Sequence, residues 1–239
     1  MLEEVAVRQP VGVSELARIT QIPKSSVQRS LVTLKQAGWL RITDPQRAWW
    51  GVTMKALAIG LRGAGEQDLR SLAGPTIQRL AAETGETVLL GLRDGDDLLV
   101  IAREDSSHVV RVFIEIGERV PLRATSAGVA IMARLEPAEV EDILAREMTE
   151  LVNGQVASPE QLRPEIAQAV AKGYAANIST WYRPHVTSIG TAIMNAEGKP
   201  IAGLTLSIPQ VRFESLVEGN LAQLTIDAAE EIGQAIASA

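Results

Sequence analysis

The chain has 239 residues, of which 46% are hydrophobic, and its formal net charge is −6. This composition supports a substantial core and argues against disorder over most of the chain. The absence of cysteine excludes disulfides, zinc–thiolate sites and cysteine nucleophiles, and with only two histidines no metal or cofactor is predicted. The acidic start MLEEVAV, and the lack of an apolar run of about 20 residues, predict a cytoplasmic protein without membrane association.

Positive charge is concentrated near the N-terminus. Residues 1–50 contain seven Lys and Arg against four Asp and Glu, which leaves this segment at +3 and the remainder at −9. A small basic unit joined to a larger acidic one is expected of a DNA-binding segment attached to a domain that stays off DNA, because phosphate contacts dominate such affinity.

The stretch IPKSSVQRSLVTLKQAGWL, residues 22–40, predicts an amphipathic helix. Val27, Leu31 and Leu34 recur at helical spacing and place one apolar face on a helix over residues 25–37, which Gly38 ends. The opposite face is polar and basic.

The residues before this helix predict a helix-turn-helix. Pro23 stops a helix from continuing through from upstream, and Ser25 with Gln28 matches a capping box. The preceding VSELARIT fits a second short helix with Ser14 as its N-cap. In a helix-turn-helix the second helix enters the major groove of DNA.

A β-hairpin is expected next, as a wing. The run at 40–43 and a short strand at 49–52 flank a turn at 44–47. Arg41 and Arg47 would reach phosphates, whereas the tryptophans are expected to pack against the helices. A protein-docking module is the alternative interpretation of this unit.

Residues 53–85 predict two helical stretches, broken by glycines at 60, 63 and 65 and kinked at Pro75. The glycines match neither the G-x-G-x-x-G nor the G-x-x-x-x-G-K-[ST] pattern of phosphate-binding loops, so a nucleotide site is rejected. Beyond them, strands are expected at 87–93, 98–103, 109–116, 188–194 and 201–207. Helices are expected at 127–135, 137–146, 159–172 and 213–236. Hairpin connections imply an antiparallel sheet flanked by helices, an α+β fold.

The acidic part predicts binding rather than catalysis. It lacks a G-x-S-x-G elbow, an H-E-x-x-H pair and an acidic metal-binding run. Ser126 lies where RATSAG enters an apolar helical run, so unpaired backbone N–H groups there would favour an anion such as a carboxylate. Equally, Thr125 or Ser126 could simply cap the helix.

These motifs together resemble the IclR family of bacterial transcriptional regulators over nearly the whole chain. The resemblance rests on Leu16-Ala17, the turn Gln21-Ile22-Pro23, KSSVQRSLVTL, GWL, PLRATSAGVAIMARL and LRPEIAQAVAKGYAAN. The chain differs from the family pattern at Gln21, where glycine is usual, and at Asn177, where aspartate is usual. Fewer residues than usual precede the first helix, so either that helix is short or the recorded start is too late.

The resemblance implies three parts: a winged helix-turn-helix over 1–53, a linker helix over 54–66 and an effector-binding and oligomerisation domain, GAF- or PAS-like, over 67–239. It implies a homodimer or homotetramer on a double-stranded DNA operator. The residues expected at bases or phosphates are Lys24, Ser25, Ser26, Gln28 and Arg29, with Arg41 and Arg47 at the backbone only.

It also implies a pocket for a small organic acid. The residues at the matching positions are Ser126, Ala127, Asn177, Ser188, Thr205 and Ser207. Thr205 and Ser207 are two apart and so share one face of a strand. Arg111 and Arg123 are further candidates for a carboxylate, and a last group would line the mouth or lie in an exposed loop: Trp181, Tyr182, Arg183 and His185.

The sequence thus predicts a regulator whose operator affinity is set by an organic-acid effector that favours one of two arrangements of the DNA-binding units. Two alternatives remain open: a carboxylate sensor that has lost DNA binding, and an enzyme acting on such an acid.

Overall fold

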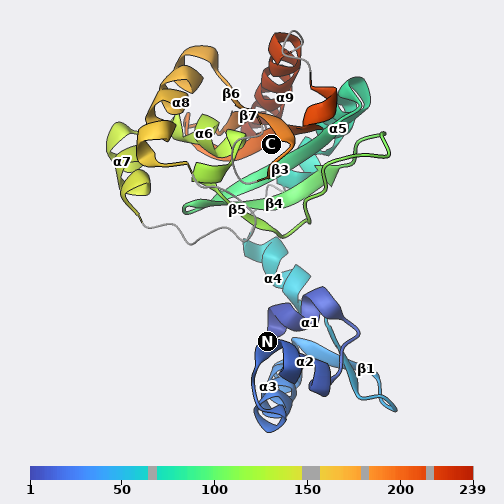
Figure 1. Ribbon diagram of the computed structural model, residues 1–239. Coiled ribbons are helices and arrows are strands. Elements are labelled where there is room, and N and C mark those ends of the chain that lie inside the picture. The colour runs from blue at the N-terminus through green and yellow to red at the C-terminus, as the bar shows by residue number, and fades with distance from the viewer. Residues whose placement is uncertain (64–68, 147–156, 179–182, 214–217, 239) are drawn as a thin grey trace. The chain divides into compact units, whose positions relative to one another are not determined.

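A computed structural model describes residues 1–63, 69–146, 157–178, 183–213 and 218–238 (Figure 1). The chain divides into two compact units, Met1–Asp68 and Leu69–Ala239.

The N-terminal unit is a winged helix-turn-helix, as predicted. Its described elements are α1 (Leu2–Arg8), α2 (Val13–Thr20), α3 (Lys24–Gln36), β1 (Leu40–Asp44), β2 (Trp49–Val52) and α4 (Lys55–Gly63). Strands β1 and β2 pair antiparallel and form the wing. Apolar side chains from all the elements before α4 make one small core, which includes Val5, Leu16, Val27, Leu31, Leu40 and Trp50. The apolar residues that recur at helical spacing in the sequence therefore form the buried face of α3.

The turn between α2 and α3 keeps a left-handed residue without glycine. Gln21 has φ 56° and ψ 24°, and its side-chain amide donates a hydrogen bond to the Arg18 carbonyl at 2.7 Å. A non-glycine residue in this conformation carries a modest steric cost, and the hydrogen bond offsets part of it. The turn thus tolerates the strain and keeps its shape.

Both predicted N-caps are wrong. Helix α3 begins at Lys24 with Pro23 in the cap position, and α2 begins at Val13 after Gly12, with no side-chain cap hydrogen bond in either case. Because α3 starts one residue early, Ser25 lies inside the first turn, where it cannot act as the N-cap of a capping box. The predicted end is confirmed, since Gly38 follows the helix with φ +79°.

The larger unit is built on an antiparallel sheet. Its strands are β3 (Thr87–Asp94), β4 (Asp97–Glu104), β5 (Arg119–Pro121), β6 (Ala175–Ile178), β7 (Val186–Met194) and β8 (Pro200–Pro209). Within the described residues they lie in the order β5-β4-β3-β8-β7-β6, with every neighbouring pair antiparallel. The predicted α+β arrangement is confirmed.

Helices cover both faces of this sheet. They are α5 (Leu69–Thr84), α6 (Ser126–Met132), α7 (Pro137–Ala145), α8 (Pro159–Lys172) and α9 (Glu218–Ser238), with 3-10 turns η1 (Leu122–Ala124) and η2 (Gln210–Arg212). Figure 1 shows α5 and α9 on one side of the sheet and α6, α7 and α8 on the other. The alternation along the strands therefore divides the core in two.

Helix α6 lies directly on the sheet because two strand positions beneath it are glycine. A Cβ atom at Gly190 would lie 2.1 Å from the Ala127 backbone nitrogen, and one at Gly203 would lie 2.8 Å from the Ala127 Cβ. Neither distance is compatible with a side chain. The glycines thus set how closely the start of α6 approaches β7 and β8.

The predicted strand at 109–116 is wrong, although the segment alternates as a strand would. Val112 and Ile114 are buried and Phe113 is exposed, yet the segment has no strand partner among the described residues. At residues 97–100 the outer edge of β4 is occupied by β5 and by backbone hydrogen bonds between Val100 and residues 117 and 118. Alternation predicted the burial correctly, but carbonyls of this segment accept hydrogen bonds from side chains instead of a neighbouring strand.

Smaller differences also separate prediction and structure. The short strands β5 and β6 were not predicted, and α4 continues through Gly60 instead of breaking there. Phe213 lies outside a helix, and α9 is described from Glu218 onward, while residues 214–217 are outside the described part.

Substituting Gly190 tests the seating of α6. Gly190→Ala should lower the free energy of unfolding by about 1–3 kcal/mol or more, because the new Cβ meets backbone that cannot rotate away. The matched control is Gly219→Ala in α9, where a Cβ meets nothing within 4 Å. That change should alter the free energy of unfolding by less than about 1 kcal/mol. Urea denaturation followed by circular dichroism measures both, and equal effects at the two positions would contradict the proposed close contact.

Candidate functional sites

The outward face of α3 carries polar and basic side chains. Lys24, Ser25, Gln28 and Arg29 are exposed, and Ser26 is half-buried. Val27 and Leu31, on the opposite face, are fully buried in the core of the unit. Arg29 donates a hydrogen bond from its Nη2 to the Ser26 Oγ at 3.4 Å, within the same helix. The helix thus presents an available row of donors of the kind that reads DNA.

The wing places two arginines at the surface. Arg41 and Arg47 are exposed, and the Asp44 carboxylate fixes the turn by accepting hydrogen bonds from the Gln46 and Arg47 backbone at 2.8 and 3.1 Å. The Arg47 guanidinium lies 5.0 Å from the centre of the Trp49 ring. Trp50 is buried in the core, as predicted for a packing residue.

The larger unit contains a pocket at the α6 face of its sheet. Five of the six predicted effector residues line it: Ser126, Asn177, Ser188, Thr205 and Ser207. Ala127 does not, because its side chain faces Gly203 beneath α6. The other lining residues are Leu89, Gly91, Leu98, Val100, Val112, Ile114, Val120, Ala124, Thr125, Arg183 and Val186.

Strand register explains why the polar residues meet. Asn177 on β6 lies opposite Ser188 on β7, which lies opposite Ser207 on β8, so the three form a row across the sheet. Residues directly opposite one another point to the same face. The Ser126 hydroxyl from α6 reaches this row, with its Oγ 3.0 Å from the Ser188 Oγ.

The structure separates the two roles proposed for the start of α6. Thr125 is the cap, because its hydroxyl accepts a hydrogen bond from the Gly128 backbone at 3.1 Å. Ser126 instead points to Ser188. The helix has only seven residues, so the polar side chains, and not its dipole, characterise this wall of the pocket.

Polarity is divided across the pocket. Its hydroxyl and amide groups come from β6, β7, β8 and the start of α6, whereas β3, β4, β5 and residues 112 and 114 contribute aliphatic side chains. Such a lining matches a ligand with a polar end and an apolar body, since each end finds a matching wall.

Among the arginines considered, only Arg183 lines the pocket. Arg111 is exposed, and Arg123 is buried, donates to the Arg146 carbonyl at 2.9 Å and is absent from the lining. Burial lowers the pKa of the Arg123 guanidinium. His185 is exposed, with φ 66°. Trp181 and Tyr182 lie outside the described residues.

Two further features bear on function. The described part of the chain contains no cluster of three His, Cys, Asp or Glu side chains able to hold a metal ion. The same residues contain no helix with the length and apolar character needed to cross a bilayer.

Family models match both units. Residues 62–234 match the model described as bacterial transcriptional regulator IclR C-terminal, and residues 6–43 match the IclR helix-turn-helix domain. The chain belongs to the IclR family. It is therefore a transcriptional regulator with a DNA-binding helix-turn-helix and a C-terminal effector domain.

Curated relatives and solved structures agree with this assignment. The HTH-type transcriptional regulator KipR of Bacillus subtilis is 30% identical over 93% of this chain and 88% of its own length. KdgR of Escherichia coli is 28% identical over 89% of this chain and 81% of its own. An IclR homolog of Microbacterium hydrocarbonoxydans, crystallised with 4-hydroxybenzoate, shares the fold with a TM-score of 0.81 at 23% identity, covering 100% of this chain and 97% of that one.

In this IclR-family chain, part of the pocket wall comes from a segment that is not a strand. It includes residues 109–116, which were predicted to form one. We call residues 105–118 the strap. It contributes Val112 and Ile114 to the pocket, and side chains hold its carbonyls in place of a neighbouring strand. Arg212 donates to Val110 at 2.6 Å, Thr87 to Val112 at 3.0 Å, and Arg103 to Ile114 at 2.6 Å.

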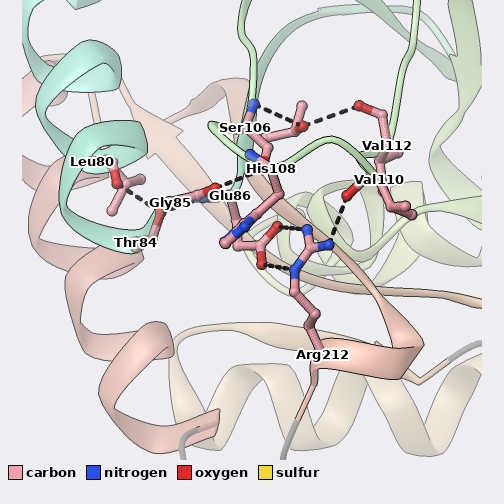
Figure 2. A network of polar contacts seen from close by, with 10 residues as sticks. Leu80, Thr84, Gly85, Glu86, Ser106, His108, Val110, Val112 and Arg212 are labelled. Atoms are coloured by element: carbon pink, nitrogen blue, oxygen red, sulfur yellow. Dashed lines mark hydrogen bonds and ion pairs between the residues drawn. The ribbon is translucent and has the colours of Figure 1, made fainter.

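The first half of the strap is anchored by a buried ion pair, which Figure 2 shows. Both oxygens of the Glu86 carboxylate accept hydrogen bonds from Arg212, at 2.7 and 2.6 Å, and the Glu86 side chain is only 8% exposed. The Ser106 hydroxyl also donates to the Gly85 carbonyl at 2.6 Å. This network ties the start of the strap to the beginning of β3.

Removing Arg212 should destabilise the effector domain strongly. Arg212→Ala leaves the buried Glu86 carboxylate without its partner, which costs about 3–5 kcal/mol. The control is Arg163→Ala, which breaks an exposed pair with Glu141 and should cost less than about 1 kcal/mol. Urea denaturation compares the two, and similar small losses would contradict a structural role for the Glu86–Arg212 pair.

Proposed function

We propose that this regulator binds operator DNA through α3 and the wing, and that an amphipathic organic anion in the effector pocket sets its operator affinity. The observation that carries the proposal is the convergence of Ser126, Ser188, Asn177 and Arg183 in one pocket opposite an aliphatic wall. A carboxylate would find hydroxyl, amide and guanidinium donors at one end, and its hydrocarbon part would fill the other.

The DNA contacts follow from exposure and chemistry. Lys24, Ser25, Ser26, Gln28 and Arg29 are proposed to approach bases or phosphates from the major groove, because they occupy the first turns of α3. Arg41 and Arg47 are proposed to contact phosphates only. The acidic effector domain has no comparable attraction for DNA, which fits the +3 and −9 division of charge.

The assembly and mechanism extend this proposal. One helix-turn-helix reads few base pairs, so the chain is proposed to act as a homodimer or homotetramer on a palindromic operator in the cytoplasm. The effector would bind one arrangement of the DNA-binding units more tightly than another and thereby shift operator affinity.

Binding is favoured over catalysis by the lining of the pocket. Among its described residues there is no histidine, cysteine, aspartate or glutamate, so a general base is not provided there. A sensor without DNA binding is disfavoured by Gln21, since the turn keeps its left-handed conformation despite the missing glycine. The 4-hydroxybenzoate complex of the Microbacterium hydrocarbonoxydans homolog supports aromatic carboxylates as ligands to test first.

The DNA-binding proposal predicts distinct effects of two kinds of arginine. Arg29→Ala should lower specific operator affinity by about 1–3 kcal/mol if the side chain reads a base. Arg41→Ala or Arg47→Ala should weaken binding to all DNA sequences alike. Each change should reduce the slope of log affinity against log salt concentration by about one. Gel shifts with DNA upstream of the gene, at several salt concentrations, measure both, with Arg163→Ala as the control. An unchanged affinity of Arg29→Ala would remove that residue from the interface.

The effector proposal predicts selective stabilisation by carboxylates. Small aliphatic and aromatic monocarboxylates, each paired with its neutral primary amide, are added to the full-length chain in a thermal-shift screen. At least one acid should raise the melting temperature more than its amide, because the pocket offers a guanidinium and several hydroxyl donors. Ser188→Ala should reduce that shift, while Ser107→Ala, on the exposed part of the strap, should not. Equal shifts by acid and amide would rule out recognition of the charge.

A further inference from the structure

The Arg183 side chain contacts both the effector pocket and the strap. It lines the effector pocket, and it also holds the strap, because its Nη1 donates to the Phe113 carbonyl at 2.9 Å and its Nη2 to the Glu118 carboxylate at 3.1 Å. No other arginine in the described part of the chain both lines the pocket and contacts the strap. A group bound in the pocket therefore has direct access to a side chain that positions the wall.

The strap is held unequally along its length. Its first half is anchored by the buried Glu86–Arg212 pair and by Ser106 (Figure 2). Its last residues pair with β4, where Gly117 donates to the Val100 carbonyl at 2.7 Å and Val100 donates to the Glu118 carbonyl at 2.9 Å. Residues 113–116 lie between these anchors.

The Arg183 contacts that hold residues 113–116 are weaker than the Glu86–Arg212 anchor of the first half. The Arg183 and Glu118 side chains are 37% and 27% exposed, compared with 23% and 8% for Arg212 and Glu86. Water screens an exposed ion pair, so that it contributes little, whereas a buried carboxylate depends on its partner. An anion entering the pocket can therefore displace Glu118 from Arg183 at small cost, while the Glu86–Arg212 anchor stays intact.

We propose that Arg183 recognises the negative charge of the effector by exchanging Glu118 and the Phe113 carbonyl for the effector's carboxylate, so that residues 113–116 respond to binding. The inference rests on the proposed effector function and names its charge-recognising residue. Glu118 keeps an alternative partner after the exchange, because its other oxygen accepts from the Glu115 backbone at 3.2 Å. The exchange therefore leaves the Glu118 carboxylate with at least one hydrogen bond.

Other cationic side chains fit this role less well. Arg123 is buried beside the Arg146 carbonyl and does not line the pocket. Arg103 is ion-paired with Asp105, donates to the Ile114 carbonyl and lies 3.9 Å from the centre of the Phe113 ring. Arg103 can therefore keep its contact with the Phe113 ring when Arg183 changes partner.

The mechanism predicts effects of opposite sign at the two partners. Arg183→Gln should weaken binding of the best carboxylate from the thermal-shift panel by about tenfold or more, since it removes a charge-assisted hydrogen bond. Arg183→Lys should recover part of the affinity. Glu118→Gln should tighten carboxylate binding by about two- to fivefold, because it removes the competitor for Arg183. The corresponding amide should bind each variant nearly equally.

Isothermal titration of the full-length chain measures these affinities. The matched controls are Arg163→Gln and Glu141→Gln, which alter an exposed ion pair that does not line the pocket. Weaker binding in both Arg183→Gln and Glu118→Gln would indicate a structural role only and would overturn the exchange. Carboxylate binding that is unchanged in Arg183→Gln would overturn the inference and leave the effector pocket standing. If no carboxylate in the panel bound the wild-type chain, the proposed effector class itself would fall.

Hydrogen exchange supplies a readout that affinity does not. In wild-type protein, the carboxylate should increase exchange in peptides covering residues 113–116 and leave residues 105–110 unchanged, since only the former lose a tether. In Arg183→Gln, which lacks the hydrogen bond to the Phe113 carbonyl, residues 113–116 should exchange faster before any ligand is added. Uniform protection of the whole strap on binding would contradict the exchange of partners.

Discussion

The effector domain depends on direct contact between the start of α6 and the strands beneath it. Gly190 and Gly203 leave no side chain between helix and sheet, so the Ala127 backbone lies against β7 and β8. That contact carries Ser126 to the hydroxyl of Ser188 and closes the polar side of the pocket. A helix held off by ordinary side chains, at the usual spacing of about 10 Å between packed layers, would leave those hydroxyls apart.

The opposite wall has a different construction. The strap alternates buried and exposed residues as a strand does, yet its carbonyls are held by arginine and threonine side chains. Side-chain hydrogen bonds can exchange partners one at a time, whereas a strand ladder must open as a unit. A fixed polar wall facing an aliphatic wall with replaceable tethers suits a domain that binds a ligand and transmits its presence.

The DNA-binding unit has one small core, to which every element before α4 contributes. A short α1 and the buried Trp50 complete a core built around Leu16 and Leu31. That core fixes which side of α3 faces outward. The left-handed Gln21 sets the angle between α2 and α3 without glycine, and its own amide helps to hold the turn. The polar side chains of Lys24, Ser25, Gln28 and Arg29 on α3 are consequently exposed.

Sequence by itself determined the helix-turn-helix with its wing and most strands, because these follow from apolar periodicity and turn residues that act over a few positions. The family followed from the resemblance of its motifs. The resemblance also identified five of the pocket residues. Only the tertiary structure decided that residues 109–116 form no strand, that Thr125 and not Ser126 caps α6, and that Arg183 joins pocket and strap. Each of these outcomes depends on which distant backbone edge or side chain is already engaged, and local sequence does not contain that information.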